Sequence, residues 1–238
     1  MSGDKQAVAA SANPLAELAF TILIPALILM QLSGAEHLGA VNALLLALAF
    51  PFGWGALGFA RRGKPGWMAL LGLASVMLTG GIGLLALDPQ WLAVKEAAVP
   101  GVIGLAVLGS AYTRHPLVST LLFNPALIDV ARVRHALAAR GTQEPFESRL
   151  RLANHLLAGT FFFSSAMNYA LASWIVTSPA GSAAFNEELG RLTLLSYPVI
   201  ALPSMLLMAG LLYFLGTSMQ RLSGLKIADL LRRAAADN

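Results

Sequence analysis

Six long apolar runs constrain this chain more than any other feature of its sequence. A helix that crosses a bilayer core of about 30 Å needs roughly 20 apolar residues. The runs cover residues 15–32, 38–60, 67–87, 97–113, 152–177 and 192–215. We therefore predict an all-α, polytopic integral membrane protein, a bundle of six transmembrane helices that forms a single domain over residues 1–238.

The composition excludes two other classes of protein. Hydrophobic residues make up 57% of the chain and charged residues only 12%, against roughly 25% charged residues in ordinary soluble domains. This is too little charge to cover the surface of a soluble globular protein, and too much apolar content for a disordered one. The chain has 0 cysteines, which excludes disulfides, thiolate metal ligands and a cysteine nucleophile.

Lysine and arginine are distributed unevenly between the two sides of the predicted bundle. If the N-terminus is inside, 14 of the 16 basic residues fall in inside segments, and only Lys95 and Arg191 fall outside. Cytoplasmic segments of membrane proteins are enriched in these residues. We therefore predict that both termini are cytoplasmic, with a cytoplasmic helical loop at residues 114–151 and a cytoplasmic tail at residues 216–238.

Polar residues in or beside the spans are candidates for contact with a substrate or a lipid. Lys95 and Glu96 open the fourth span, and Arg191 precedes the sixth. A charge that lies partly inside a bilayer often marks a site, although a cation at a membrane surface can also be a simple anchor. Ser164 and Asn168 share one face of the fifth span, where they either line a substrate path or bond to a neighbouring helix.

Two further candidates lie at the ends of the apolar runs. Tyr197 brings a hydroxyl group into the sixth span. Glu17 follows Asn13 and Pro14, which resemble an N-cap and a first helical residue. Glu17 therefore either stabilises the first turn of a helix or binds a proton or an ion.

The cytoplasmic loop is predicted to contain a short amphipathic helix from Pro125 to Arg140. Apolar residues recur there at three- and four-residue spacing, and Gly141 suits the position after a helix end. Arg132, Arg134 and Arg140 would then face anionic lipids of the inner leaflet. The alternative is that the helix packs against the end of the bundle itself.

Glycine and proline interrupt five of the spans. The glycines at positions 80, 81 and 83 make the third span the most probable site of a true break, as in helices that expose their backbone to a transported substrate. The alternative is that these residues are merely tolerated, as they commonly are in membrane helices. Small residues four apart, such as Ala97 and Gly101, favour close approach of helices or of two copies in a homodimer.

Motifs of soluble enzymes and of cofactor sites are missing from the sequence. It contains no GxSxG, HExxH or CxxC motif and no phosphate-binding GxxxxGK loop. We expect no enzymatic activity, no metal and no cofactor. The pI of about 9.8 is explained by the basic cytoplasmic segments, so we expect no nucleic-acid partner.

Several short motifs resemble those of the bacterial septation protein A-like family, also called inner-membrane-spanning proteins of cell envelope biogenesis. The matching residues are Arg62, Lys64, Pro65, Trp67, Gly80, Gly81, Asp88, Trp91, Lys95, Leu108 to Ser110, Pro116 and Leu117. The second half is more similar to a longer branch of predicted inner-membrane proteins. It carries that resemblance at Leu122 to Pro125, Trp174 to Pro179, Phe185 to Gly190 and Ser196 to Met205.

The resemblance implies a multi-pass protein of the bacterial inner membrane, with no catalytic residues. Our first expectation is a protein that supports cell envelope integrity or division through membrane partners or lipids. The alternative is a small transporter, or a protein that translocates lipids, acting on an anionic solute or a lipid headgroup. The partners that we expect are the bilayer, anionic inner-leaflet lipids, division or envelope membrane proteins, and a second copy of the chain.

Overall fold

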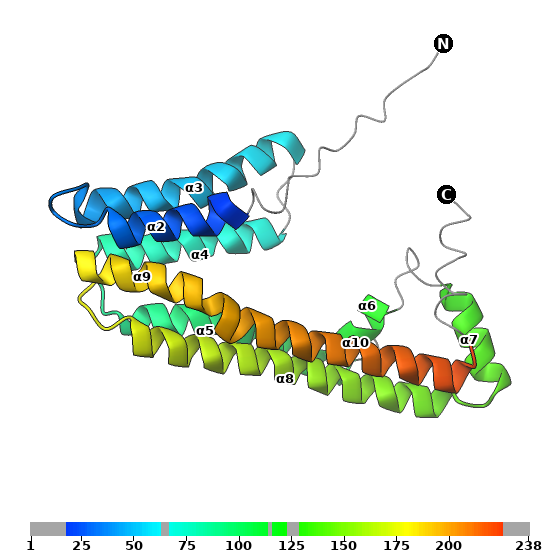
Figure 1. Cartoon of the computed structure of the whole chain (residues 1–238). Helices are drawn as coiled ribbons and strands as arrows, with labels where there is room; N and C mark the ends of the chain where they lie inside the picture. The colour runs from blue at the N-terminus through cyan, green and yellow to red at the C-terminus, as the bar shows by residue number, and fades with distance from the viewer. Residues whose placement is uncertain (1–17, 63–66, 114–115, 123–128, 226–238) are drawn as a thin grey trace, which may run out of the picture. The chain divides into compact units, whose positions relative to one another are not determined.

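The computed structural model of this chain describes residues 18–62, 67–113, 116–122 and 129–225. Every regular element within these ranges is a helix (Figure 1), which confirms the predicted all-α class. Glu17, the predicted helix start at Asn124 and Pro125, and most of the predicted tail lie outside the described residues.

The chain divides into two compact units. Unit 1 consists of Met1–Lys95 and Ala170–Tyr197, and unit 2 of Glu96–Tyr169 and Pro198–Asn238. Three continuous helical segments contain the boundaries between the units. That residues 1–238 form a single transmembrane domain stays a prediction.

Unit 1 is built around helix α2, which contacts both α3 and α9, while α3 also contacts α4 (Figure 1). Its elements are η1 (Ala19–Leu23), α2 (Ile24–Gln31), α3 (Gly39–Arg62), α4 (Trp67–Leu84) and α9 (Ala183–Ser196). Phe185 of α9 and Leu44 of α3 are among its fully buried side chains. The apolar faces of these helices therefore pack on one another.

Unit 2 has one hydrophobic cluster to which five helices contribute. The elements of unit 2 are α5 (Gln90–Ser110), α6 (Leu117–Leu122), α7 (Val130–Ala139), α8 (Gln143–Ile175), η2 (Tyr197–Ala201) and α10 (Leu202–Ser223). Of these, α5, α8 and η2 extend partly into unit 1. The cluster joins Val107 of α5, Val118 of α6, Val133 of α7, Leu157 of α8 and Leu215 of α10.

Each of the six apolar runs coincides with helix over most of its length, but two of the helices begin earlier than predicted. Helix α5 begins at Gln90, since the side chain of Asp88 accepts a hydrogen bond from the Gln90 backbone N–H at 2.8 Å. Helix α9 begins at Ala183, since the N-cap Ser182 accepts from Phe185 N at 3.1 Å. Lys95 and Arg191 therefore lie inside helices, not in loops as predicted.

Of the two alternatives for the third span, the structure fits the second, because α4 continues through its glycines to Leu84 without a break. These glycines serve close packing instead. A Cβ atom on Gly80 would lie 2.7 Å from Leu48 Cδ1, and one on Gly83 would lie 2.6 Å from Leu44 Cδ2.

The prolines of the first and sixth spans widen their helices without ending them. The π-helical turn η1 directly precedes Pro25, and Ile24 N donates there to Ala19 O, five residues back. The second π-helical turn, η2, contains Pro198 and precedes Pro203. A proline lacks an N–H and clashes with the carbonyl four residues before it, which favours such local widening.

Three helical segments in the described part of the chain are long and apolar enough to cross a membrane. They are Gly39–Leu57, Gln90–Ser110 and Ala183–Ser223, the last of which has 41 residues and runs through α9, η2 and α10. Helix α8, which contains the predicted fifth span, is not one of them. Three such helices support the membrane class, and the six-span topology with cytoplasmic termini stays a prediction.

Candidate functional site

The ammonium group of Lys95 is the centre of a polar cluster in unit 1. Lys95 Nζ donates to Thr79 Oγ1 at 2.7 Å and to Ser75 Oγ at 3.2 Å, and all three side chains are half-buried. Ser75 and Thr79 lie four residues apart on α4, so both hydroxyl groups face the same direction. Thr79 in turn donates its own hydroxyl proton to Ser75 O at 3.0 Å.

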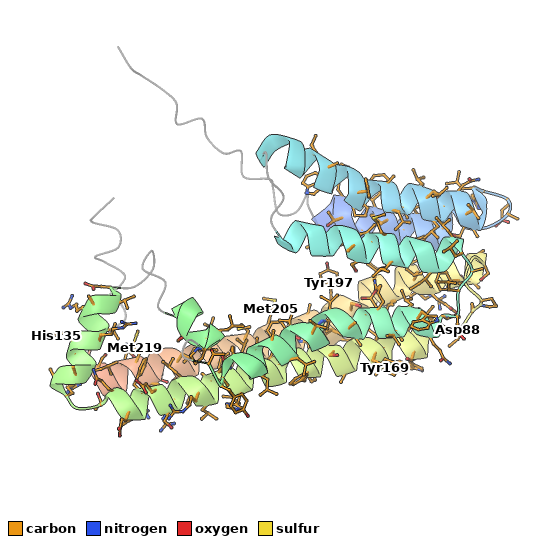
Figure 2. All side chains as sticks on the ribbon, turned by 180° about the vertical axis from the view of Figure 1, so that it is seen from behind. Asp88, His135, Tyr169, Tyr197, Met205 and Met219 are labelled. Carbon is orange, nitrogen blue, oxygen red and sulfur yellow. The ribbon has the colours of Figure 1, made fainter. Side chains whose placement is uncertain are left out.

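This cluster lies along the helices rather than at their ends. Lys95 is five residues after the start of α5, and Thr79 is five residues before the end of α4. At 1.5 Å per residue, each is about 8 Å along its helix from the turn that joins them. Figure 2 labels Asp88 in that turn. Lys95 thus connects α4 to α5 within a segment apolar enough to cross a membrane.

Glu96 follows Lys95 on α5 and is also half-buried. Consecutive residues leave an α-helix about 100° apart. The two side chains therefore cannot both face the hydroxyl groups of α4. The role predicted for Glu96 as a contact for a substrate or lipid stays a prediction.

Arg191 forms a surface ion pair. Its guanidinium group contacts the Glu187 carboxylate one turn earlier on α9, and their side chains are 58% and 44% exposed. Such exposed pairs contribute little stability. The neighbouring Glu188 does not join this pair, because its carboxylate accepts from the backbone N–H groups of Thr177 and Ser178 at 3.0 and 2.9 Å. Glu188 therefore holds the start of the loop between α8 and α9 against α9 through these hydrogen bonds.

The polar stripe on α8 bonds within its own helix. Asn168 Nδ2 donates to Ser164 O at 2.7 Å and to Ser164 Oγ at 3.3 Å. The contact between helices comes from Ser165 instead, whose hydroxyl donates to Ala97 O of α5 at 2.8 Å. Gly101 leaves space for it, since a Cβ there would lie 3.1 Å from Ser165 Oγ. The predicted close approach at Ala97 and Gly101 is thus an approach of two helices within unit 2.

Tyr197 is the first residue of the π-helical turn η2, and its side chain is 40% exposed. Figure 2 labels it on the helix that continues from α9. Its predicted role as a contact for a substrate stays a prediction, as do those of Asn168 and Ser164.

The apolar stripe of α7 packs against the protein, as the second alternative for this helix proposed. Val133 and Leu137 are 0% and 3% exposed and belong to the hydrophobic cluster of unit 2. The helix begins at Val130, not at Pro125 as predicted, because the Asp129 side chain accepts from Arg132 N at 3.0 Å and caps it. The predicted end is confirmed, with Arg140 as the C-cap and Gly141 at a φ of +63°.

The three arginines of α7 and its C-cap have different surroundings. Arg132 and Arg134 are exposed. The guanidinium group of Arg140 lies against Gly224, the left-handed C-cap of α10 with a φ of +72°, so closely that a side chain at Gly224 would collide with it. A cation at a helix C-terminus is favoured by the helix dipole. Arg140 is nevertheless exposed, like Arg132 and Arg134, and the lipid contacts predicted for the three arginines stay predictions.

Sequence reasoning missed two fully buried asparagines. Asn154 of α8 donates to Val107 O at 2.6 Å and accepts from Val118 N at 3.2 Å. Asn186 of α9 donates to Ala40 O at 2.7 Å and to Ser33 Oγ at 3.0 Å. Each was visible only as one amide in an apolar helix pattern, and its backbone partners lie far away in the sequence.

No group of three or more His, Asp or Glu side chains that could hold a metal ion occurs in the described ranges. His155, whose Nδ1 lies 2.7 Å from Arg151 O, bonds to its own helix. Comparison of the chain with protein-family models, with curated proteins and with solved structures finds no match.

Proposed function

We propose that this chain is a multi-pass protein of the bacterial inner membrane that supports envelope integrity or division as a scaffold for membrane partners or lipids. The resemblance to the septation protein A-like family supports this from the sequence. One structural observation carries the proposal: Lys95, a half-buried cation inside a candidate span, hydrogen-bonds to the hydroxyl groups of α4. This is the environment of a group that joins two helices.

Other polar groups in both units support the same function. Ser165 connects α8 to α5, and Asn154 and Asn186 bind backbone carbonyl groups of neighbouring segments. In a bilayer, such hydrogen bonds between helices stabilise association by about 0.6 kcal/mol or more each. Polar groups used in this way fit a protein whose function depends on a stable helical framework.

The alternative is a small transporter, or a lipid-translocating protein, for an anionic solute or lipid headgroup. One observation favours it: Lys95 and Glu96 are both charged residues within Gln90–Ser110, a helix apolar enough to span a membrane. Ionisable residues inside membrane segments commonly belong to substrate or ion pathways. In that case the hydroxyl groups of α4 would orient Lys95 toward a passing anion.

Complementation of a deletion strain distinguishes the two functions. In a scaffold, Lys95→Met should still complement, because methionine keeps most of the length of the side chain and the other contacts within unit 1 remain, although the hydrogen bonds to Ser75 and Thr79 are lost. In a transporter, the same variant should accumulate to normal levels, unfold at a nearly normal temperature and still fail to complement. Arg191→Gln is the matched comparison, since it removes the other predicted external cation, which forms an exposed ion pair with Glu187 and should be tolerated in a scaffold.

A second set of variants tests the structural role of the cluster directly. Ser75→Ala with Thr79→Val removes two acceptors of the ammonium group and should lower the unfolding temperature, because a buried charge then loses hydrogen bonds. Adding Lys95→Met to that double variant should recover much of the loss. If the triple variant is less stable than the double variant, Lys95 does not act through these hydroxyl groups.

A further inference from the structure

A cavity of about 560 Å³ lies in unit 2 where the end of α5, α7 and the start of α8 meet. Tyr112 and Ser119 line it from the chain that follows α5, Arg134 from α7, and Glu147 and Arg151 from α8. Figure 2 marks this end of unit 2 by His135 on α7 and Met219 on α10. None of these residues takes part in the Lys95 cluster.

The cavity is amphipathic. Leu137, Phe146 and Leu150 form the apolar part of its lining, and all three belong to the buried hydrophobic cluster of unit 2. Arg134 and Arg151 line it with exposed side chains. An apolar floor with a charged rim fits a molecule that has both an apolar and a charged part.

The cavity is level with the end of a candidate membrane span. Helix α5 is apolar enough to cross a bilayer and ends at Ser110, and the next three residues, 111 to 113, all line the cavity. A span that ends there leaves the hydrocarbon core and enters the headgroup region.

The charged groups of the lining favour an anion. Two guanidinium groups, of Arg134 and Arg151, stand against one carboxylate, of Glu147, which gives a formal charge of +1 from two positive charges and one negative charge. Arginine binds phosphate oxygens through two parallel N–H groups, which makes it the preferred cation for phosphate recognition.

From this juxtaposition we infer that the cavity binds the headgroup phosphate of an anionic phospholipid, with Arg134 and Arg151 on the phosphate and the start of the acyl chains against Leu137, Phe146 and Leu150. This goes beyond the proposed function, because a scaffold and a transporter could both hold such a lipid. The orientation of the protein does not enter the argument, since the end of α5 reaches a membrane surface in either orientation.

Native mass spectrometry of the full-length protein in detergent tests the site, with short-chain phosphatidylglycerol as the probe. Arg134→Gln with Arg151→Gln should weaken the apparent Kd about tenfold or more, as expected for lost charge-assisted hydrogen bonds. Arg132→Gln is the matched control, because it removes an exposed arginine of the same helix that does not line the cavity, and it should change the Kd less than about twofold. Glu147→Gln should strengthen binding about threefold by removing repulsion.

Three results would overturn the inference. An equal loss in Arg132→Gln would mean that a basic surface attracts anionic lipid without a site. Equal binding of phosphatidylcholine with the same chains would remove the requirement for an anionic headgroup. Displacement of the lipid by glycerol phosphate at an equal concentration would identify a site for a soluble phosphate compound. Should the double arginine variant not fold, Glu147→Gln still decides, because unchanged or weaker binding contradicts the inference.

Discussion

Among the residues that the structure describes, units 1 and 2 each contain one fully buried asparagine, but the two residues are satisfied to different degrees. In unit 2 Asn154 uses both ends of its amide, donating to Val107 O while its Oδ1 accepts from Val118 N and lies 3.3 Å from Ser110 Oγ. In unit 1 Asn186 uses only its nitrogen, and its Oδ1 is buried with no hydrogen-bond partner in the described structure. The amide orientation follows from Ala40 O, which can only accept.

The helices within each unit are therefore held together in different ways. In unit 2, Asn154 joins α5, α6 and α8 with both ends of its amide, although Ser204 Oγ of α10 is buried there without a partner among the described residues. In unit 1, the half-used Asn186 is accompanied by close helix packing. Gly190 of α9 illustrates the packing, since a Cβ there would lie 2.8 Å from Ala26 O and 2.6 Å from Met30 Cγ. The comparison teaches that a buried amide contributes most where both its donor and its acceptor end are used, even though one partner of Asn154, Val107 O, also accepts from Ser110 Oγ at 2.6 Å.

The largest effect should come from Asn154→Leu, which leaves Val107 O and Val118 N without this partner in a buried environment. We expect a loss of about 3 kcal/mol in the free energy of unfolding, or a lowering of Tm on the order of 6–12 °C. Thermal unfolding of the purified protein in one detergent measures it. Asn168→Leu is the control, since Asn168 donates to its own helix, and it should change Tm by less than about 3 °C.

Gly190→Ala should have the next largest effect, because its methyl group meets a backbone oxygen that cannot move aside alone. Overpacking of this kind costs about 2 kcal/mol, which lowers Tm by about 4–8 °C. The same thermal measurement applies. An unchanged Tm would show that α2 and α9 separate easily, and the packing account of unit 1 would then be wrong.

Asn186→Leu should be milder than Asn154→Leu. It loses the hydrogen bond to Ala40 O but also removes the unpartnered Oδ1, and these two contributions oppose each other. We expect a net loss of about 1 kcal/mol and a lowering of Tm by about 2–4 °C. If this loss equals that of Asn154→Leu, the difference between the two asparagines has no energetic meaning.

Gly159→Ala should have the smallest effect, and it should have the opposite sign. No atom lies within 4 Å of the position of its added Cβ. Alanine is more favourable than glycine in a helix by up to about 1 kcal/mol. A small rise in Tm would therefore show that the loss in Gly190→Ala comes from crowding and not from replacing a glycine as such.

The positions of the helices were largely predictable from the sequence, because apolar run length is a local property. The end of α7 at Arg140 and its buried stripe at Val133 and Leu137 were predictable for the same reason. The starts of α5 and α9 were not recognised, although Asp88 before Pro89 and Ser182 before Ala183 are ordinary capping signals. Both signals lie between apolar runs, where run length alone does not indicate where a helix starts.

The candidate site was predictable only in part. Lys95 stood out because a cation beside a span is rare, yet its partners lie 16 and 20 residues earlier on another helix. Nothing in a single sequence indicates which face of α4 meets α5. The same reason explains why Asn154 was missed, since its partner Val107 is 47 residues away.

The cap at Asp88 also determines which insertions and deletions the sequence can accept at the start of α5. Because Asp88 determines where α5 starts, the number of residues between it and Lys95 sets the direction of the ammonium group. One inserted residue would turn that group about 100° away from Ser75 and Thr79. Four inserted residues would return it to nearly the same face but move it about 6 Å further from the turn, past Thr79 and level with Ser75. This stretch of helix should therefore tolerate many substitutions in its side chains, whereas an insertion or a deletion costs at least one of the two hydrogen bonds.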